Sequence, residues 1–335
     1  MPANPLDGFT VDTNDITYLG QDLKRPECIL AEKDGTVWSA DERGGVVKIA
    51  ADGTQAFIPQ RFASGGAIEG TVPNGMAIAD NGDILIANFG TNCLERMKRN
   101  GETTVMFETL DGGAWPGKLN FVVRDSENRL WITISTMIDD YMPASINKDV
   151  QDGRILLYEE GKGVRVVAEN IHFANECRLD AKEEYIYVAQ TCGRNVARFR
   201  IAPNGDLSDK EIFGPTDTGA FVDGITFDSF GNLWGTHVMV DRIFAITPEG
   251  ELKILLDDGR PEDIENIDRA FQAGEITTEL LMDCGGSIAR WTASITFAGD
   301  DLKTVYVGSL LGDRIASFKS PVAGLPMAHW NESYA

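Results

Sequence analysis

The sequence lacks the features that define several large protein classes. No part of its 335 residues contains the roughly 18–20 uninterrupted apolar residues of a membrane-spanning helix. The first fifteen residues have neither the basic nor the apolar segment of a secretory signal, so no such signal is expected. Neither a GxSxG nucleophile elbow nor a complete Walker loop is present, which argues against a serine hydrolase and a P-loop nucleotide-binding protein.

Cysteine is scarce and basic residues are few. The 5 cysteines are scattered, odd in number and without a CxxC pair, so we expect free thiols packed inside the fold and a reducing, cytoplasmic setting. There are 30 basic against 52 acidic residues, for a net charge of −22. A field of that sign repels nucleic acid and anionic membranes. We therefore expect neither as a partner, and predict a small-molecule substrate for a monomer or small homo-oligomer.

The chain does contain one short sequence motif that repeats six times with variations. Its clearest copies, VDGITFDSFGNLWGTH (222–237) and LNFVVRDSENRLWITI (119–134), begin with an alternating apolar run that turns at Gly, Asp or Asn into a second run. This is the pattern of a β-hairpin. Most copies follow one another at intervals of 46 to 55 residues. Repeats of about that length are typical of propeller blades, so the chain is predicted to be an all-β, six-bladed β-propeller.

The prediction treats residues 1–335 as a single propeller domain whose last blade is closed by the other end of the chain. The strand DITYLG (15–20) is expected to pair with RIASFK (314–319), which removes exposed edges. The tail, 320–335, is expected to be a surface extension.

Two insertions interrupt the predicted blades. A polar loop at about 137–153 is too long for a tight hairpin and is expected over the channel mouth. A segment at about 259–281 is expected to contain a short helix, because Pro261 followed by acidic residues is typical of a helix start.

The small or polar residue near the start of each repeat, here called its leading residue, defines the candidate site. Equivalent positions of the blades converge on the central channel of a propeller. Carboxylate and amide oxygens are hard ligands that suit Ca²⁺ or Mg²⁺ better than a soft metal. The sequence therefore predicts a central metal-binding channel. The leading residues are Glu27, Asn74, Asn120, Asn175, Asp223 and Ser294.

Some of these residues have simpler explanations. The pairs Asn74-Gly75 and Asp223-Gly224 are common turn formers, and either one alone would be assigned to a turn. His172 is a candidate catalytic acid or base and His237 a candidate substrate-binding residue. Both histidines could instead bridge blades through hydrogen bonds.

The repeats resemble the family of senescence marker protein 30, gluconolactonase and luciferin-regenerating enzyme. The resemblance extends over about 20–320 and rests on four motifs, each leading into a hairpin. It implies a six-bladed propeller with a divalent metal in the channel, usually Ca²⁺ with Zn²⁺, Mg²⁺ or Mn²⁺ as alternatives, and hydrolysis of a lactone. The motifs are Pro-Glu (26–27), Leu-Asn (119–120), Ala-Asn-Glu (174–176) and Val-Asp-Gly (222–224).

The resemblance also implies roles for particular residues. Asp223 matches a metal ligand that is the candidate general base, and Asn120 matches an asparagine beside the metal and the substrate. Lys118 stands where some sugar-lactonase members have a substrate-binding arginine. The implied metal ligands are Glu27, Asn120, Asn175 and Asp223. The other candidate substrate-binding residues are Asn74, Phe121, Glu176, Tyr141 and His237.

The sequence departs from the family pattern after two leading residues. Phe121 stands where the family often has Asp, and Glu176 replaces a Gly. Together with bulky groups expected at the mouth, these departures favour a less polar substrate than a sugar lactone. The hypothesis is a metal-dependent lactonase or ester hydrolase that opens a small, less polar lactone with metal-activated water. A phosphotriesterase, isomerase or lyase on the same scaffold is the alternative, followed by a non-catalytic ligand-binding propeller. The bulky residues expected at the mouth are Trp115, Phe121, Met137, Tyr141 and Phe173.

Overall fold

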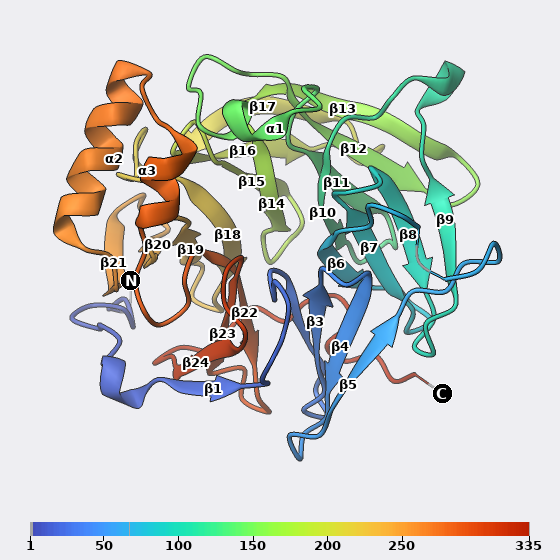
Figure 1. Cartoon of the computed structure of the whole chain (residues 1–335), viewed down its shortest axis with the longest axis horizontal. Helices are drawn as coiled ribbons and strands as arrows, with labels where there is room; N and C mark the ends of the chain where they lie inside the picture. The colour runs from blue at the N-terminus through green and yellow to red at the C-terminus, as the bar shows by residue number, and fades with distance from the viewer. Residues whose placement is uncertain (1–2, 67, 335) are drawn as a thin grey trace.

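The computed structural model describes residues 3–66 and 68–334, and they form the predicted all-β, six-bladed propeller. Six four-stranded sheets stand around a central axis (Figure 1). In each repeat the first apolar run forms the innermost strand of a blade and the second run forms the strand beside it. In blade 3, for example, Phe121 lies opposite Thr133 and Val123 opposite Trp131 across an antiparallel hairpin.

Each blade contributes one strand to each of four concentric positions. The innermost strands are β2 (Ile29–Ala31), β6 (Pro73–Ile78), β10 (Leu119–Arg124), β14 (Ala174–Leu179), β18 (Val222–Phe227) and β22 (Thr292–Ala298). The second strands are β3 (Val37–Asp41), β7 (Ile84–Asn88), β11 (Leu130–Ile134), β15 (Tyr185–Gln190), β19 (Leu233–His237) and β23 (Thr304–Ser309). The third strands are β4 (Gly45–Ile49), β8 (Cys93–Met97), β12 (Gly153–Glu159), β16 (Asn195–Ile201), β20 (Arg242–Ile246) and β24 (Ile315–Lys319). The outer strands are β5 (Gln55–Pro59), β9 (Thr103–Phe107), β13 (Gly163–Ile171), β17 (Leu207–Phe213), β21 (Leu252–Asp257) and β1 (Thr17–Leu19).

The ring is closed by a strand from the other end of the chain. Strand β1 pairs antiparallel with β24, with Thr17 opposite Ser317 and Leu19 opposite Ile315. The predicted pairing of the two terminal segments is confirmed. Blade 6 therefore ties the two ends of the chain together, which joins the first blade to the last.

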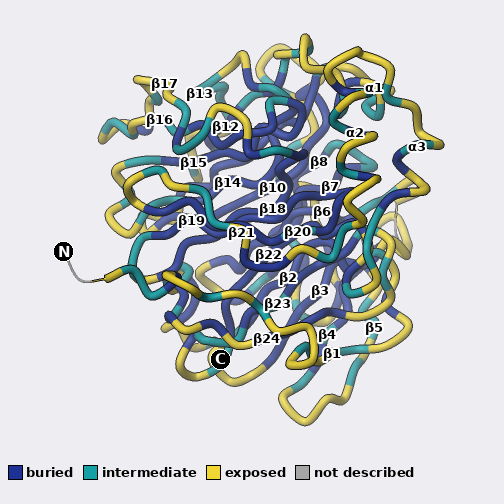
Figure 2. The backbone as a smooth tube through the Cα atoms, turned by 90° about the vertical axis from the view of Figure 1, so that its left-hand side faces the viewer, coloured by how far each residue is buried: buried dark blue, intermediate teal, exposed yellow. Residues whose placement is uncertain are grey.

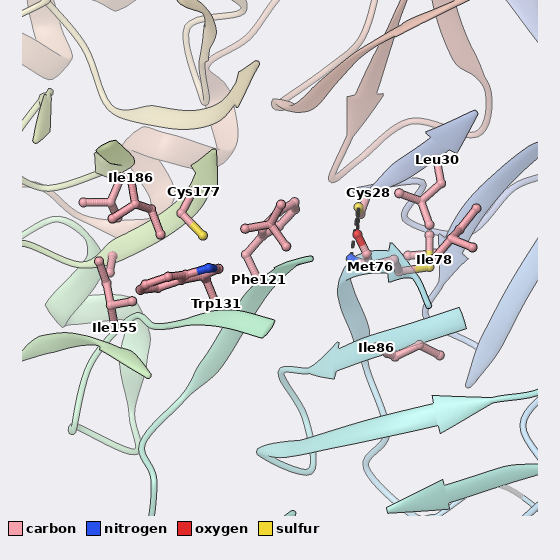
Figure 3. Close-up of a cluster of buried hydrophobic side chains, with 14 of the residues drawn as sticks. Cys28, Leu30, Met76, Ile78, Ile86, Phe121, Trp131, Ile155, Cys177 and Ile186 are labelled. Carbon is pink, nitrogen blue, oxygen red and sulfur yellow. Dashed lines mark hydrogen bonds between the residues drawn. The ribbon is translucent and has the colours of Figure 1, made fainter. Parts of the chain in front are cut away.

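Apolar side chains fill the space between neighbouring blades. The buried residues are concentrated in the inner strands, while the exposed ones follow the outer loops (Figure 2). Figure 3 shows one cluster, in which Phe121 and Trp131 of blade 3 lie beside Cys177 of blade 4. All five cysteines are free and buried.

The three α-helices of the described residues lie outside the blades. The insertion between β11 and β12 contains α1 (Tyr141–Ser145), and the one between β21 and β22 contains α2 (Pro261–Ala273) and α3 (Thr278–Asp283). Phe271 of α2 packs edge-on against Phe221, just before β18, with ring centroids 5.3 Å apart. Within the described chain, none of the helices has both the length and the apolar character needed to span a bilayer. Short 3-10 segments occupy Thr13–Asp15 and Asp111–Gly113.

The tail is not the surface extension that the sequence predicted. It crosses the ends of the inner strands that lie opposite their leading residues, and its Trp330 is buried in the core. The tail therefore covers one end of the channel. Its contacts there join Leu325 N to Phe227 O (2.8 Å), His329 Nε2 to Ala31 O (2.9 Å) and Arg124 Nη2 to Glu332 Oε2 (2.5 Å).

Candidate metal centre

A break in strand register accompanies most of the leading residues. Five of the six inner strands shift register against their second strands at this place. Such a bulge bends the strand and re-aims a side chain, and bulges are frequent next to active sites. A Cβ on Gly224 would lie 2.3 Å from the carbonyl oxygen of Ala293, so glycine permits the close approach of blades 5 and 6 after Asp223. The shifts contain Asn74, Asn120, Asn175, Asp223 and Ser294.

Five of the six leading residues line one cavity of about 250 Å³. Ser294 is fully buried and is not among the lining residues. Most of the remaining wall is apolar or aromatic. The polar lining residues are Arg25, Glu27, Glu42, Asn74, Asn120, Ser145, Asn175, Thr191 and Asp223. The others are Phe89, Tyr141, Met142, Phe173, Val238, Met239, Trp291, Leu310 and Leu311.

The hydroxyl of Ser294, outside the lining, has no hydrogen-bond partner in the described chain. Four of the leading side chains that do line the cavity also keep a buried oxygen without such a partner. The atoms are Glu27 Oε2, Asn120 Oδ1, Asn175 Oδ1 and Asp223 Oδ1. Leaving a buried acceptor unpaired costs about 1–3 kcal/mol, and four of them on one cavity form a costly arrangement without a ligand. The amide nitrogen of Asn175 donates to Thr191 Oγ1 (3.2 Å), which leaves its oxygen free. Two carboxylates and two amide oxygens fit a hard divalent cation such as Ca²⁺.

The two carboxylates of this set lie in an environment that disfavours negative charge. Burial raises the pKa of Glu27 to about 7, against the opposing effect of Arg25. Burial, together with the nearby carboxylates of Glu27 and Glu176, raises the pKa of Asp223 well above its ordinary value. A cation bound between them would reverse both effects, because an opposite charge favours the ionised form.

The candidate donor set combines carboxylates with amides. Among residues 3–66 and 68–334 no group of three or more His, Cys, Asp or Glu side chains is placed to hold a metal ion. The candidate centre has two acids, Glu27 and Asp223, and takes its other donors from Asn120 and Asn175. Such a mixture of carboxylate and amide oxygens is ordinary for Ca²⁺ and unsuited to soft metals.

Arg25 is a cavity residue that the sequence analysis missed. Its Nη2 donates to Asn74 Oδ1 (2.8 Å), and Asn74 Nδ2 in turn donates to the backbone oxygen of Asn120 (2.9 Å). Its Nη1 is 4.0 Å from Glu27 Oε2 and makes no hydrogen bond in the described chain. Arg25 has a φ of +54°, in the left-handed region that non-glycine residues avoid. The only sequence signal was a basic residue two positions before a leading glutamate.

The other predicted substrate residues divide into two groups. Tyr141 of α1 and Asn74 line the cavity. Lys118 does not belong to the lining, and its Nζ is 2.7 Å from Asp139 Oδ1. Phe121 lies in the core between blades 3 and 4, under the guanidinium of Arg178 at 4.4 Å from the ring centroid.

Glu176 and the two histidines also lie outside the cavity lining. Glu176 is fully buried, 3.0 Å from the Arg178 guanidinium, and accepts a hydrogen bond from the backbone of Ile225 (3.2 Å). The ring of His237 stacks on Phe244, with centroids 4.4 Å apart, and its Nε2 lies 2.9 Å from Thr218 Oγ1.

His172, at the end of blade 3, is half-buried. The segment that follows α1, at Lys148 and Val150, lies near the ring, whose Nδ1 has no hydrogen-bond partner in the described chain. Burial lowers the pKa of His172. The structure thus places it beside the inserted loop and does not bring it to the four unpaired oxygens.

Comparison with known proteins agrees with the resemblance noted in the repeats. A family model described as the SMP-30/gluconolactonase/LRE-like region matches residues 107–256, which confirms the resemblance. The chain is also similar to 6-deoxy-6-sulfogluconolactonase of Pseudomonas putida, with 19% identity over 171 residues. That match covers 50% of this chain and 49% of the relative, so the chain spans about half the length of the curated relative it matches.

Solved structures share the fold over nearly the whole chain. A gluconolactonase from Xanthomonas campestris has a TM-score of 0.66 and 15% identity, covering 92% of this chain and 89% of that one. A calcium-binding regucalcin from Agrobacterium tumefaciens has a TM-score of 0.61 and 15% identity, covering 92% and 95%. Virginiamycin B lyase from Staphylococcus aureus has a TM-score of 0.56 and 15% identity, covering 93% and 88%. At these identities the likeness shows the fold alone.

Proposed function

Because the chain contains an SMP-30/gluconolactonase/LRE-like region, we propose that it is a divalent-metal-dependent hydrolase, a lactonase that opens a small lactone. The observation that carries the proposal is the set of four buried, unpaired oxygens that converge from four blades on one cavity. The names of two similar proteins, a sulfogluconolactonase and a gluconolactonase, support a lactone as the substrate class. The similar regucalcin, described as calcium-binding, supports Ca²⁺, with Mg²⁺, Mn²⁺ and Zn²⁺ as alternatives.

Glu27, Asn120, Asn175 and Asp223 would hold the cation. When bound, it supplies Lewis acidity to a carbonyl oxygen and a favourable field for a developing oxyanion. A carboxylate engaged by a dication is a weak base. We therefore assign Asp223 first to the ligand set and second to orienting the attacking water and accepting its proton.

The apolar wall favours a substrate less polar than a sugar lactone. Phe89 packs edge-on against Tyr141, with ring centroids 4.7 Å apart, and both line the cavity with Phe173 and Trp291. Such surfaces bind apolar groups by removing their area from water. We keep Asn74 and Tyr141 as substrate-binding candidates. We propose no direct substrate contact for the candidates outside the lining, which are Lys118, Phe121, Glu176, His172 and His237.

The test is hydrolysis of a lactone panel, sugar-derived, aromatic and aliphatic, after chelation and after restoring Ca²⁺, Mg²⁺, Mn²⁺ or Zn²⁺ one at a time. We expect turnover that needs a cation and is fastest on lactones with an apolar substituent. No turnover on any lactone, despite tight cation binding, would contradict the lactonase proposal.

That negative result would favour the alternative, another metal-dependent reaction on this scaffold, such as that of a phosphotriesterase, isomerase or lyase. A protein named as a lyase does share the fold. We further propose a reducing, cytoplasmic setting, on the ground that the five cysteines are free and buried.

A further inference from the structure

The cavity opens beside a groove of unusual charge. The groove has a volume of about 560 Å³ and lies along blades 1 and 6, and it shares Arg25, Glu42, Leu310 and Leu311 with the cavity. Four of the six charged residues along it are basic, in a chain whose net charge is −22. The basic residues are Lys24, Arg25, Arg290 and Arg314, and the acidic ones are Glu42 and Asp313.

Arg25 stands at the junction of the cavity and the groove. Its Nη1 is buried without a hydrogen bond, and Glu27 is the one acid within 4.0 Å of it in the part of the chain that the structure describes. Glu27 belongs to the candidate ligand set. Once the charge of Glu27 is shared with a cation, Arg25 has no other acid within salt-bridge distance among residues 3–66 and 68–334.

The charges of the site with a dication bound indicate which kind of group would pair with the free N–H of Arg25. Two buried carboxylates, Glu27 and Asp223, balance one dication, and the Arg25 guanidinium then adds one positive charge. Glu42 is exposed to solvent at the rim, where its charge is screened. A guanidinium with an open N–H is best paired by a carboxylate, sulfonate or phosphate.

We propose that the substrate of this site carries an anionic group, which Arg25 binds at the junction while the reacting carbonyl lies at the four oxygens. This rests on the proposed function and narrows its substrate class to lactones, or related esters, with an apolar body and a carboxylate, sulfonate or phosphate. Lys24, Arg290 and Arg314 add a favourable field along the approach. The left-handed backbone at Arg25 costs free energy that the surrounding structure sustains, as is common at ligand-binding positions.

The test measures binding without turnover, using a cyclic ketone that cannot be hydrolysed. The probes are oxocyclopentanecarboxylate and its uncharged carboxamide, titrated calorimetrically into calcium-loaded and chelated protein. Wild-type protein loaded with Ca²⁺ is expected to bind the carboxylate at least about tenfold more tightly than the carboxamide, the range of a charge-assisted hydrogen bond. Added NaCl should weaken the binding of the carboxylate and leave the binding of the carboxamide unchanged.

Variants of Arg25 make the outcome specific. Arg25→Gln should lose the preference in calcium-loaded protein, while Arg25→Lys should keep part of it. Both replacements are non-glycine residues, so each meets the same left-handed backbone constraint as the arginine. Arg200→Gln, on the third strand of blade 4, is the matched control and should behave as wild type. Equal affinity for the two probes, failure to bind the carboxylate, or an unchanged preference in Arg25→Gln would overturn the proposal. None of these results depends on lactone turnover, whose absence would instead contradict the proposed function.

Discussion

Blades 1, 3 and 5 each carry a polar residue near both ends of the inner strand, five positions apart. At the end covered by the tail, the acid accepts a hydrogen bond from the tryptophan indole of the second strand. These pairs are Glu32–Trp38, Asp125–Trp131 and Asp228–Trp234, at 2.6, 2.9 and 2.9 Å. At the cavity end, an oxygen is left without a partner in the described chain. These residues are Glu27, Asn120 and Asp223.

Blade 5 shows the difference most clearly, because both of its residues are buried aspartates. Oδ1 of Asp228 accepts three backbone N–H groups at 2.9 Å, and Oδ2 accepts from Trp234 and from the Asn232 amide. Oδ1 of Asp223 accepts no hydrogen bond from the described residues. A buried acid whose hydrogen bonds are complete stabilises the fold. A buried acid with an unpaired oxygen costs free energy that a bound ligand would recover.

The largest expected effect comes from Asp223→Asn, which removes one negative charge from the incomplete end. We expect kcat/KM for lactone hydrolysis to fall about a thousandfold, the scale of losing a main electrostatic contact in an active site. Asp228→Asn is the matched control and should keep the wild-type rate below its melting temperature. If Asp223→Asn retained full activity, the cavity end would have no catalytic role.

The second expected effect is the reverse, a loss of stability with activity intact. Asp228→Asn puts an amide where three N–H groups and an indole point, and should lower the free energy of unfolding by about 3 kcal/mol. Urea unfolding monitored by circular dichroism measures it. A loss as large in metal-free Asp223→Asn would erase the distinction between the two ends.

The repeat pattern explains why so much of this could be predicted from the sequence. Alternating apolar runs joined by D/N-G turns specify each hairpin locally. The regular spacing of the repeats identifies equivalent positions, so the number of blades, the closure of the ring and the leading residues could be predicted. The bulges could not be predicted, and they decide which of two successive residues faces the channel. Phe121, expected at the mouth, therefore lies in the core.

Arg25 and the tail escaped prediction for related reasons. Arg25 lies outside the repeat, and its place in the cavity depends on a left-handed backbone that no local motif indicates. The tail has no apolar periodicity, and its burial depends on contacts with strand ends that only the assembled propeller brings together.

The third prediction assigns His237, which stacks on Phe244 and lies outside the cavity lining, a structural role and no contact with the substrate. Burial lowers its pKa to about 3 from the usual 6.5, so below pH 6.5 the unfolded chain takes up a proton that the folded one does not. Stability is therefore lost as pH falls, by about 2 kcal/mol from this group between pH 8 and pH 5. His237→Gln should lack that part of the acid destabilisation and keep the wild-type KM. Equal acid sensitivity, or a raised KM, would contradict the assignment.

The smallest expected effect concerns the apolar wall above the open oxygens. Tyr141→Ala removes a ring that lines the cavity and should raise KM for an aromatic lactone about tenfold, with less effect on a sugar lactone. Tyr18→Ala, on β1, changes a ring that is 41% exposed and serves as the control. Equal effects on the two lactones would remove the argument for a less polar substrate.

The central claim is that the cavity ends of the inner strands form a site for one divalent cation. Calorimetric titration of Ca²⁺ into chelated wild-type protein, Asp223→Asn and Asp228→Asn tests it most directly. We predict one ion per chain in the wild type and in Asp228→Asn, and loss of that binding in Asp223→Asn. Binding that survives in Asp223→Asn, or is absent from the wild type for Ca²⁺, Mg²⁺, Mn²⁺ and Zn²⁺ alike, would contradict the claim.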